Sequence, residues 1–305
     1  MVRERPRGGR SRRWSWDRLT PALMIAPSVV LIAIFVYGFI AYSGFSSLTR
    51  WNNVVPDYTF VGLRQYRFLF EDTRFQADVR NTVVFTVCFL TLSILLGFGA
   101  ALLLDQKLPG TIVFQNVYLF PLALSFVVTG VVWRWLWNPT YGIDAALRAV
   151  HLDPARAGLG VITDVRTALY AVVVAATWQM SGFCMAMFLA GLRGIPEELR
   201  EAARVDGASA LQAFRYVILP QLNPVVLSAI IVLGHISLKI FDLIYVMTFG
   251  GPGHATDMPG LYMFVAIFQQ NLYAYGAAIA TVLLLMVAVL VVPYLVWNLR
   301  QAGEQ

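Results

Sequence analysis

Two charged residues and a histidine interrupt a long apolar stretch in the C-terminal third of the sequence. Lys239 and Asp242 lie three positions apart within Val225–Thr248, and His235 precedes Lys239 by one helical turn. Ionised side chains in an apolar helix are costly, so they pair or line a wet cavity. At positions i and i+3 the two charges are neighbours and can neutralise each other. Two interpretations remain open: a polar stripe that faces a solute pathway, or a structural ion pair.

Other arrangements that carry chemistry are missing from the sequence. It contains no phosphate-binding P-loop, no zinc-binding HExxH motif and no nucleophile elbow. The three histidines are far apart in sequence, and the two cysteines, Cys88 and Cys184, lie inside apolar stretches. We therefore expect no enzymatic activity, metal site or bound cofactor in this chain, and we interpret the cysteines as small apolar side chains.

The elements that position Lys239 and Asp242 are long apolar segments. Of the 305 residues, 58% are hydrophobic and 13% are charged, whereas a soluble domain has about 25% charged residues. A segment of about 20 apolar residues crosses the hydrocarbon core of a bilayer. The sequence therefore predicts an all-α membrane protein with six transmembrane helices. They are expected near Pro21–Tyr42, Val79–Leu104, Val113–Trp135, Ala168–Leu189, Val225–Thr248 and Gly276–Val296.

The placement of basic residues predicts the side of the membrane on which each loop lies. Seven arginines precede the first apolar stretch, which is typical of a cytoplasmic tail. By alternation, the loops that contain Lys107 and Arg193–Arg215 are cytoplasmic, and so are both termini. Residues 250–275 contain no lysine or arginine and are expected outside. The net charge of +6 does not indicate nucleic-acid binding, because no basic patch interleaves with aromatic residues.

The cytoplasmic loop over Gly194–Pro224 predicts a helix–turn–helix outside the membrane. Pro196 followed by two glutamates favours a helix start, since acidic residues suit the positive end of the helix dipole. Gly207 favours a helix end, and Ser209 can cap a second short helix. Taken alone, this loop is equally well a solvated connector or a docking surface for another protein.

The loop resembles the EAA motif of permeases of ATP-binding cassette (ABC) importers. The resemblance is carried by Glu201-Ala202-Ala203, Asp206-Gly207-Ala208 and Ile218-Leu219-Pro220. It extends to segments that are similar to carbohydrate-type permeases, and to their glucose/mannose branch in particular. The segments similar to carbohydrate-type permeases in general are Phe241–Leu243, Thr248 and Gly250–Gly253. Those similar to the glucose/mannose branch are Trp178-Gln179, Ser181–Phe183, Phe188–Ile195, Thr256–Pro259 and Val291–Tyr294.

The resemblance implies the six-helix fold of type I ABC importer permeases with a cytoplasmic coupling helix. It divides the chain into a basic tail (1–19), a transmembrane permease domain (20–298) with a coupling loop (194–220), and a C-terminal tail (299–305). The residues implied to contact an ATPase subunit are Glu201, Ala202, Ala203, Asp206, Gly207 and Ala208.

The resemblance also implies partners and a substrate. The expected partners are a second homologous permease, two ATPase subunits that hold ATP and Mg, and an extracytoplasmic sugar-binding protein. The expected location is the cell membrane of a prokaryote, with lipid around the helices. The implied substrate is a monosaccharide such as glucose or mannose. Alternatives are maltose, trehalose or another α-glucoside, glycerol-3-phosphate and, from another class, an ion-gradient-driven carrier.

Comparison with the related maltose permeases implies a set of sugar-contacting positions. Gln179 and Ser237 would bind hydroxyl groups, and two phenylalanines would stack on a sugar ring. The set departs in polarity from the maltose pattern, which argues against a maltose-like site. Its last three members lie on the helix face opposite Lys239 and Asp242, which favours a structural role for this charged pair over a place in the pathway. The full set is Leu122, Phe126, Gln179, Phe183, Leu233, Ser237 and Ile240.

Overall fold

The computed structural model describes residues 16–106, 109–149 and 161–302, in two compact units, Met1–Phe45 and Ser46–Gln305. Most of the predicted basic tail lies outside the described residues, and so do Lys107 and residues 303–305 of the predicted C-terminal tail.

The first unit is a single helical rod. It consists of α1 (Trp16–Ile32), the π-helical turn η1 (Ala33–Gly38) and most of α2 (Phe39–Ser47). The segment Leu23–Ser47 is long and apolar enough to cross a membrane, and no residue of its most apolar window is buried within the chain. Because an apolar helix of this length is stable in hydrocarbon, it fits the first predicted span.

The core of the second unit is the packing of α4 (Thr73–Asp105) against α8 (Ala168–Arg193). Gly97 lies at their closest approach: a Cβ atom there would be 2.4 Å from the Cβ of Cys184 and 2.7 Å from the backbone nitrogen of Met185. A small residue at such a crossing lets two membrane helices approach closely. The buried rings of Phe85 and Phe89 stack beside this contact, 5.4 Å apart.

The third predicted span, Val113–Trp135, is bent in the structure. Helices α5 (Thr111–Leu119) and η2 (Phe120–Ala123) turn by 101° into α6 (Phe126–Leu136). The turn lies where Leu124 is extended and the side chain of Ser125 accepts a hydrogen bond from the amide of Val128. This cap supplies a local alternative to the helical hydrogen bond and starts a new helix.

The fifth predicted span is also interrupted. Just before its predicted start at Val225, helices α10 (Ala210–Ala213), η3 (Phe214–Ile218) and α11 (Leu219–Gln221) meet α12 (Asn223–Leu238) at 55°. Helix α12 then ends three residues before α13 (Asp242–Met247) begins. The described residues contain four helices long and apolar enough to cross a membrane, or up to six if each bent pair forms one span. This agrees with the predicted all-α fold.

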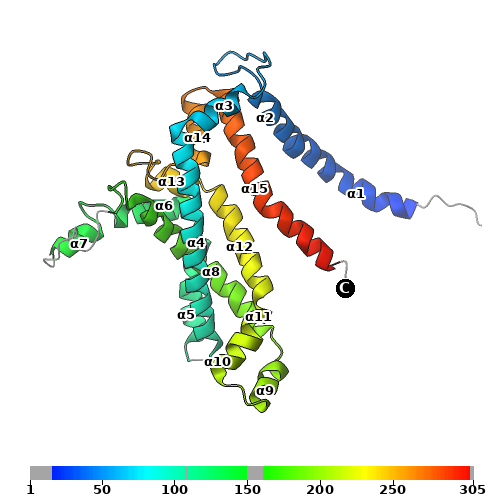
Figure 1. The fold of residues 1–305 in the computed structure, drawn as a ribbon, viewed down its shortest axis with the longest axis vertical. Helices are drawn as coiled ribbons and strands as arrows, with labels where there is room; N and C mark the ends of the chain where they lie inside the picture. The colour runs from blue at the N-terminus through cyan, green and yellow to red at the C-terminus, as the bar shows by residue number, and fades with distance from the viewer. Residues whose placement is uncertain (1–15, 107–108, 150–160, 303–305) are drawn as a thin grey trace, which may run out of the picture. The chain divides into compact units, whose positions relative to one another are not determined.

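The remaining helices complete the two ends of the second unit. Helix α15 (Tyr273–Ala302) is the last span, and α7 (Ile143–Ala149) is a short connecting helix. Helices α3 (Arg64–Glu71), α14 (Pro259–Phe264) and η4 (Val265–Gln269), with the 248–258 loop, lie toward one end, called the α14 end. Helices α9 (Glu197–Val205) and α10 form the other, called the α9 end. Helix α4 extends from one end to the other (Figure 1).

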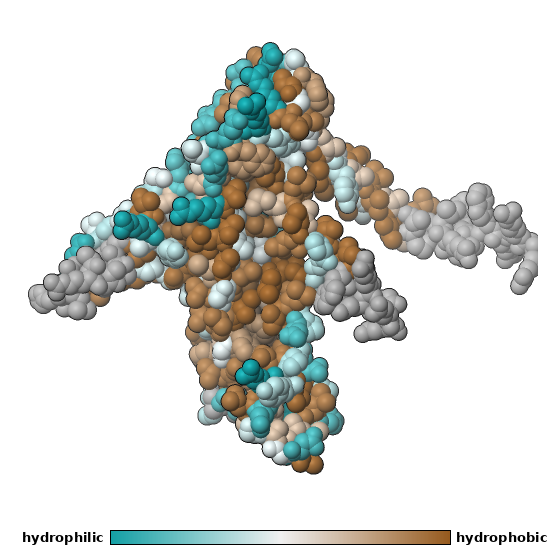
Figure 2. Space-filling model, viewed as in Figure 1, coloured by the Kyte–Doolittle hydropathy of each residue, from teal (hydrophilic) through white to brown (hydrophobic). Residues whose placement is uncertain are grey.

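Hydrophobic residues dominate the surface of the second unit between these ends. Figure 2 shows hydrophilic residues gathered around α3 at one end and around α9 and α10 at the other, with an apolar zone between them. A chain that places an apolar zone between two polar ends is matched to a bilayer.

Candidate functional site

The predicted helix–turn–helix is present at the α9 end and is built by the residues that predicted it. Helix α9 follows Pro196 and carries two glutamates in its first turn. Gly207 adopts φ +78°, a left-handed conformation that glycine adopts without steric cost. The side chain of Ser209 accepts from the amide of Gln212, whose side chain accepts from the amide of Ser209. This reciprocal capping box fixes the start of α10.

The predicted coupling residues form an open surface. Glu201, Ala202, Asp206 and Gly207 are exposed, whereas Ala208 is half-buried and Ala203 packs inward. Three apolar side chains beside them are exposed as well: Val205 (86%), Leu211 and Tyr216. Exposed apolar side chains beside small residues provide a surface that another protein can approach closely.

Arg200 connects α9 to the ends of two long helices. Its Nη1 and Nη2 atoms both lie 3.3 Å from Oδ2 of Asp105, the last residue of α4. Nη2 also donates to the carbonyl oxygen of Leu192 in α8, at 3.1 Å. Sequence reasoning missed Arg200 and Asp105, because 95 positions separate them and neither stands out within its own segment.

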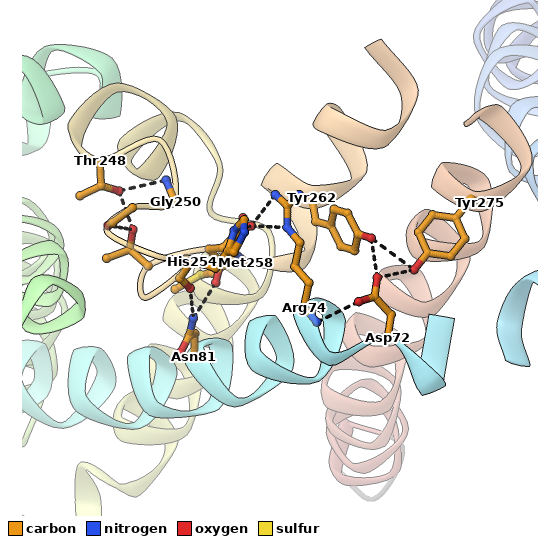
Figure 3. Close-up of polar contacts among 12 residues, drawn as sticks. Asp72, Arg74, Asn81, Thr248, Gly250, His254, Met258, Tyr262 and Tyr275 are labelled. Carbon is orange, nitrogen blue, oxygen red and sulfur yellow. Dashed lines mark hydrogen bonds and ion pairs between the residues drawn. The ribbon is translucent and has the colours of Figure 1, made fainter. Parts of the chain in front are cut away.

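A second polar cluster ties the 248–258 loop to the first turns of α4 at the α14 end (Figure 3). Arg74 donates from Nε to Oδ2 of Asp257 at 2.7 Å, and its Nη2 lies 2.5 Å from the same oxygen. Asn81 donates to the carbonyl oxygens of His254 and Asp257, at 3.1 and 3.0 Å. Because the Asp257 side chain has no exposed surface, its charge depends on Arg74 and these neighbours. Single-sequence reasoning could not pair Arg74 with Asp257.

Asp72 joins the same region to α14 and α15. Its carboxylate accepts hydrogen bonds from the hydroxyls of Tyr262, at 2.5 Å, and Tyr275, at 2.8 Å. Burial by itself raises the pKa of Asp72, but the two tyrosine hydroxyls, the Arg74 amide and the Arg74 charge outweigh it and hold the pKa below its usual value. Burial and the hydrogen bond to Asp72 raise the pKa of Tyr262 to about 12.

The 248–258 loop has its own internal hydrogen bonds. The hydroxyls of Thr248 and Thr256 lie 2.6 Å apart, and Thr256 also donates to the carbonyl of Gly251 at 2.9 Å. Gly250 adopts φ +81° with Asp257 packed against it. A hollow of about 420 Å³ opens beside this loop; its lining includes Arg134, Asn138, Thr163 and Pro252. The loop therefore has a defined conformation and borders a hollow at the α14 end.

The predicted sugar-contacting residues are in two different environments. Leu122 is exposed, and Phe126 and Phe183 are half-buried. Gln179, Leu233, Ser237 and Ile240 are all buried.

Two of the buried residues are held by hydrogen bonds within the chain. Gln179 donates to the carbonyl of Leu124 at 2.7 Å, and Ser237 accepts from the hydroxyl of Thr86 at 2.9 Å. Contact of these buried side chains with a sugar therefore requires α8 or α12 to move.

The ion pair that the spacing of Lys239 and Asp242 allows is not formed in this conformation. The two residues do not share a helix, because α12 ends at Leu238 and α13 begins at Asp242. Both side chains are exposed, and no ion pair joins them within the described part of the chain. Asp242 lies in the first turn of α13, where a negative charge is favoured by the helix dipole.

Residues 93–301 match a protein family described as "Binding-protein-dependent transport system inner membrane component". A probable ABC transporter permease protein of Pyrococcus horikoshii is 43% identical over 93% of this chain and 96% of its own length. A xylose/arabinose import permease protein of Haloferax volcanii is 37% identical, over 90% and 86%. A trehalose/maltose transport system permease protein of Thermococcus litoralis is 33% identical, over 90% and 91%.

Solved structures share the fold. A chain in the crystal structure of a bacterial ABC transporter involved in the import of the acidic polysaccharide alginate superposes with a TM-score of 0.79. It covers 93% of this chain and 96% of its own, at 19% sequence identity. A second alginate transporter structure, in complex with a pentasaccharide-bound periplasmic protein, gives a TM-score of 0.77.

Proposed function

Because the chain belongs to the family of binding-protein-dependent transport system inner membrane components, we propose that it is the sugar permease of an ATP-driven importer. The observation that carries this proposal is the capped, exposed α9–α10 loop with the sequence Glu201–Ala208 on its surface. In the proposed assembly two ATPase subunits, which hold ATP and Mg, bind this loop and its counterpart on a second homologous permease. Both termini and the α9 end are cytoplasmic, in the cell membrane of a prokaryote.

The α14 end then faces outward and receives an extracytoplasmic sugar-binding protein. Support comes from the shaped 248–258 loop and the adjoining hollow that contains Arg134 and Asn138. ATP binding draws the coupling helices together and opens the pathway outward, and the sugar passes between the two permeases. Gln179 and Ser237 are proposed to contact it when α8 or α12 moves, with Phe126 and Phe183 as stacking surfaces.

The proposed substrate is a monosaccharide such as glucose or mannose. A relative named for xylose and arabinose, both monosaccharides, supports this size class. A second candidate is an oligosaccharide such as trehalose or maltose, which the name of another relative favours.

The proposal is tested by uptake into proteoliposomes that contain the full transporter. The radiolabelled substrates are the sugars glucose, mannose, xylose, arabinose, trehalose and maltose, together with glycerol-3-phosphate, each with its candidate binding protein. We expect uptake of a monosaccharide only when Mg-ATP and the binding protein are both present. Uptake without ATP that follows an ion gradient would identify a carrier and refute the proposal. ATP-dependent uptake of trehalose or maltose alone would keep the importer and correct the substrate.

A further inference from the structure

Helix α4 is the one described element whose side chains hold both the α9 end and the 248–258 loop by ion pairs. It is a single helix of 33 residues, which corresponds to about 50 Å at 1.5 Å per residue. No proline interrupts it, whereas the chain bends by 101° between η2 and α6 and by 55° between α11 and α12. A displacement applied to one end of an uninterrupted helix therefore reaches the other.

At the α9 end, one side chain makes the polar contacts between α9 and the long helices. Among the described residues, the side-chain hydrogen bonds from α9 to other helices all come from Arg200, which contacts Asp105 of α4 and Leu192 of α8. Ala203 is the only residue of α9 that is buried. The ring of Phe98 on α4 also stacks on Phe214, 6.2 Å away, beyond the turn. A movement of α9 thus reaches α4 through Arg200 and through the segment that follows α10.

The middle of α4 moves together with α8. The absence of a side chain at Gly97 brings the backbones of the two helices into close contact, so that even a single Cβ atom there would overlap Cys184. Phe98 packs edge-on against Phe188, with ring centroids 5.1 Å apart. Close packing of this kind resists sliding and transmits strain.

At the α14 end, Arg74 and Asn81 connect α4 to the 248–258 loop. Arg74 lies in the first turn of α4 and Asn81 about two turns later, so hydrogen bonds hold the loop at two positions along the helix. The ring of Tyr262 lies under the Arg74 guanidinium, 4.2 Å from its centre, which fixes the arginine from its other side. Rotation or translation of α4 must therefore displace this loop.

We propose that α4 transmits the movement of the coupling helix to the 248–258 loop, with Arg200 as the positioning residue at the α9 end. This inference rests on the proposed function, in which the two ends face the ATPase and the binding protein. It assigns to Arg200 and Asp105 a role in coupling that is separate from ATPase binding. The loop would change its exposure when ATP binds on the opposite side of the membrane.

The test uses the full transporter in nanodiscs, with Cys88 and Cys184 replaced by alanine and an Ala255→Cys reporter in the loop. The labelling rate of this cysteine by a hydrophilic maleimide is measured before and after Mg-ATP with vanadate. We expect a clear change in the parent transporter. In Arg200→Gln and Asp105→Asn the change should shrink by roughly 2- to 30-fold, the range for mutations that alter coupling between sites. ATPase subunits should remain bound and hydrolyse ATP.

Two further variants control for charge and for structure. Arg193→Gln removes a basic residue that is exposed at the end of α8 and should leave the response intact. The exchange of Arg200→Asp with Asp105→Arg should restore much of it. A full response in both Arg200→Gln and Asp105→Asn, or no response in a parent transporter that imports sugar with ATP, would overturn the role of α4. Absence of ATP-dependent uptake in the parent would instead refute the proposed function.

Discussion

The two ends of α4 are held by ion pairs of different kinds. At the α14 end, Arg74 meets a carboxylate without exposed surface, and several hydrogen bonds surround the pair. At the α9 end, Arg200 and Asp105 remain 23% and 21% exposed. Arg74 is itself 21% exposed, so the two pairs differ in the carboxylate: Asp257 is fully buried and Asp105 is not. Leaving a buried charge unpaired strongly destabilises a protein, whereas a pair that solvent reaches on both sides contributes less. The comparison indicates that α4 is connected rigidly at the α14 end and more adjustably at the α9 end.

The largest expected effect is that of Arg74→Gln, which leaves the buried carboxylate of Asp257 without its cation. We expect a loss of about 3–5 kcal/mol in the free energy of unfolding, measured by thermal denaturation of the purified protein in detergent. Arg200→Gln should cost about 1 kcal/mol or less. The matched control is Glu71→Gln, which removes an ion pair with Arg67 whose side chains are 78% and 61% exposed. Equal losses for Arg74→Gln and Arg200→Gln would show that the two connections do not differ in rigidity.

A smaller effect is expected from Gly97→Ala in the middle of α4. The added Cβ atom meets Cβ and backbone atoms of α8, so the two helices must separate. Overpacking of this kind costs about 1–3 kcal/mol. Gly99→Ala is the control, because a Cβ atom there has no neighbour within 4 Å. If both variants melt alike, α4 and α8 are not the tightly packed pair that links the two ends.

Gly207→Val is the next variant, at the turn of the coupling loop. Within this chain its effect should come from backbone conformation, because a Cβ atom at Gly207 meets nothing within 4 Å. Holding a branched residue at φ +78° costs about 1–2 kcal/mol, which should distort the loop and abolish uptake while the protein stays in the membrane. Gly207→Asn should retain much of the uptake, since asparagine tolerates this conformation. Normal uptake by Gly207→Val would contradict a coupling role for the loop.

The smallest effect is pH-dependent and belongs to Asp72. Its folded pKa lies below the unfolded value of about 3.9, so its contribution is complete above that value and is lost as the pH falls through the folded pKa. We expect about 1 kcal/mol or less, because the carboxylate is partly exposed and screened. The melting temperatures of the parent and Asp72→Asn should therefore differ at pH 6 and converge in strong acid. A difference that persists in acid would show that the charge of Asp72 is not involved.

Local signals in the sequence predicted the α9 end well. Pro196, Gly207 and Ser209 act on their own backbone, and the structure places all three as expected. The resemblance based on this loop is confirmed by the family match. Local chemistry of this kind does not depend on the rest of the fold.

Features that depend on distant contacts could not be predicted. Arg74 and Asp257 are 183 positions apart, and nothing in either neighbourhood identifies the other. The bend at Ser125 lies inside the apolar stretch Val113–Trp135, and the composition of that stretch does not indicate where a bend occurs. Lys239 and Asp242 had suitable helical spacing, but the helix ends between them.

The proposed coupling role of the α9–α10 loop is tested most directly by mapping which part of the chain contacts the ATPase subunit. A photoactivatable cross-linker is attached to Val205→Cys at the α9 end or to Val55→Cys in the 46–305 unit, in a chain whose two native cysteines are replaced by alanine. Both positions are strongly exposed, at 86% and 75%, so access does not favour either.

If the α9–α10 loop is the coupling surface, we expect Val205→Cys to be cross-linked to the ATPase subunit and Val55→Cys not to be. The opposite pattern, or cross-linking from neither position in a transporter that hydrolyses ATP, would contradict the assignment of the α9–α10 loop as the coupling surface.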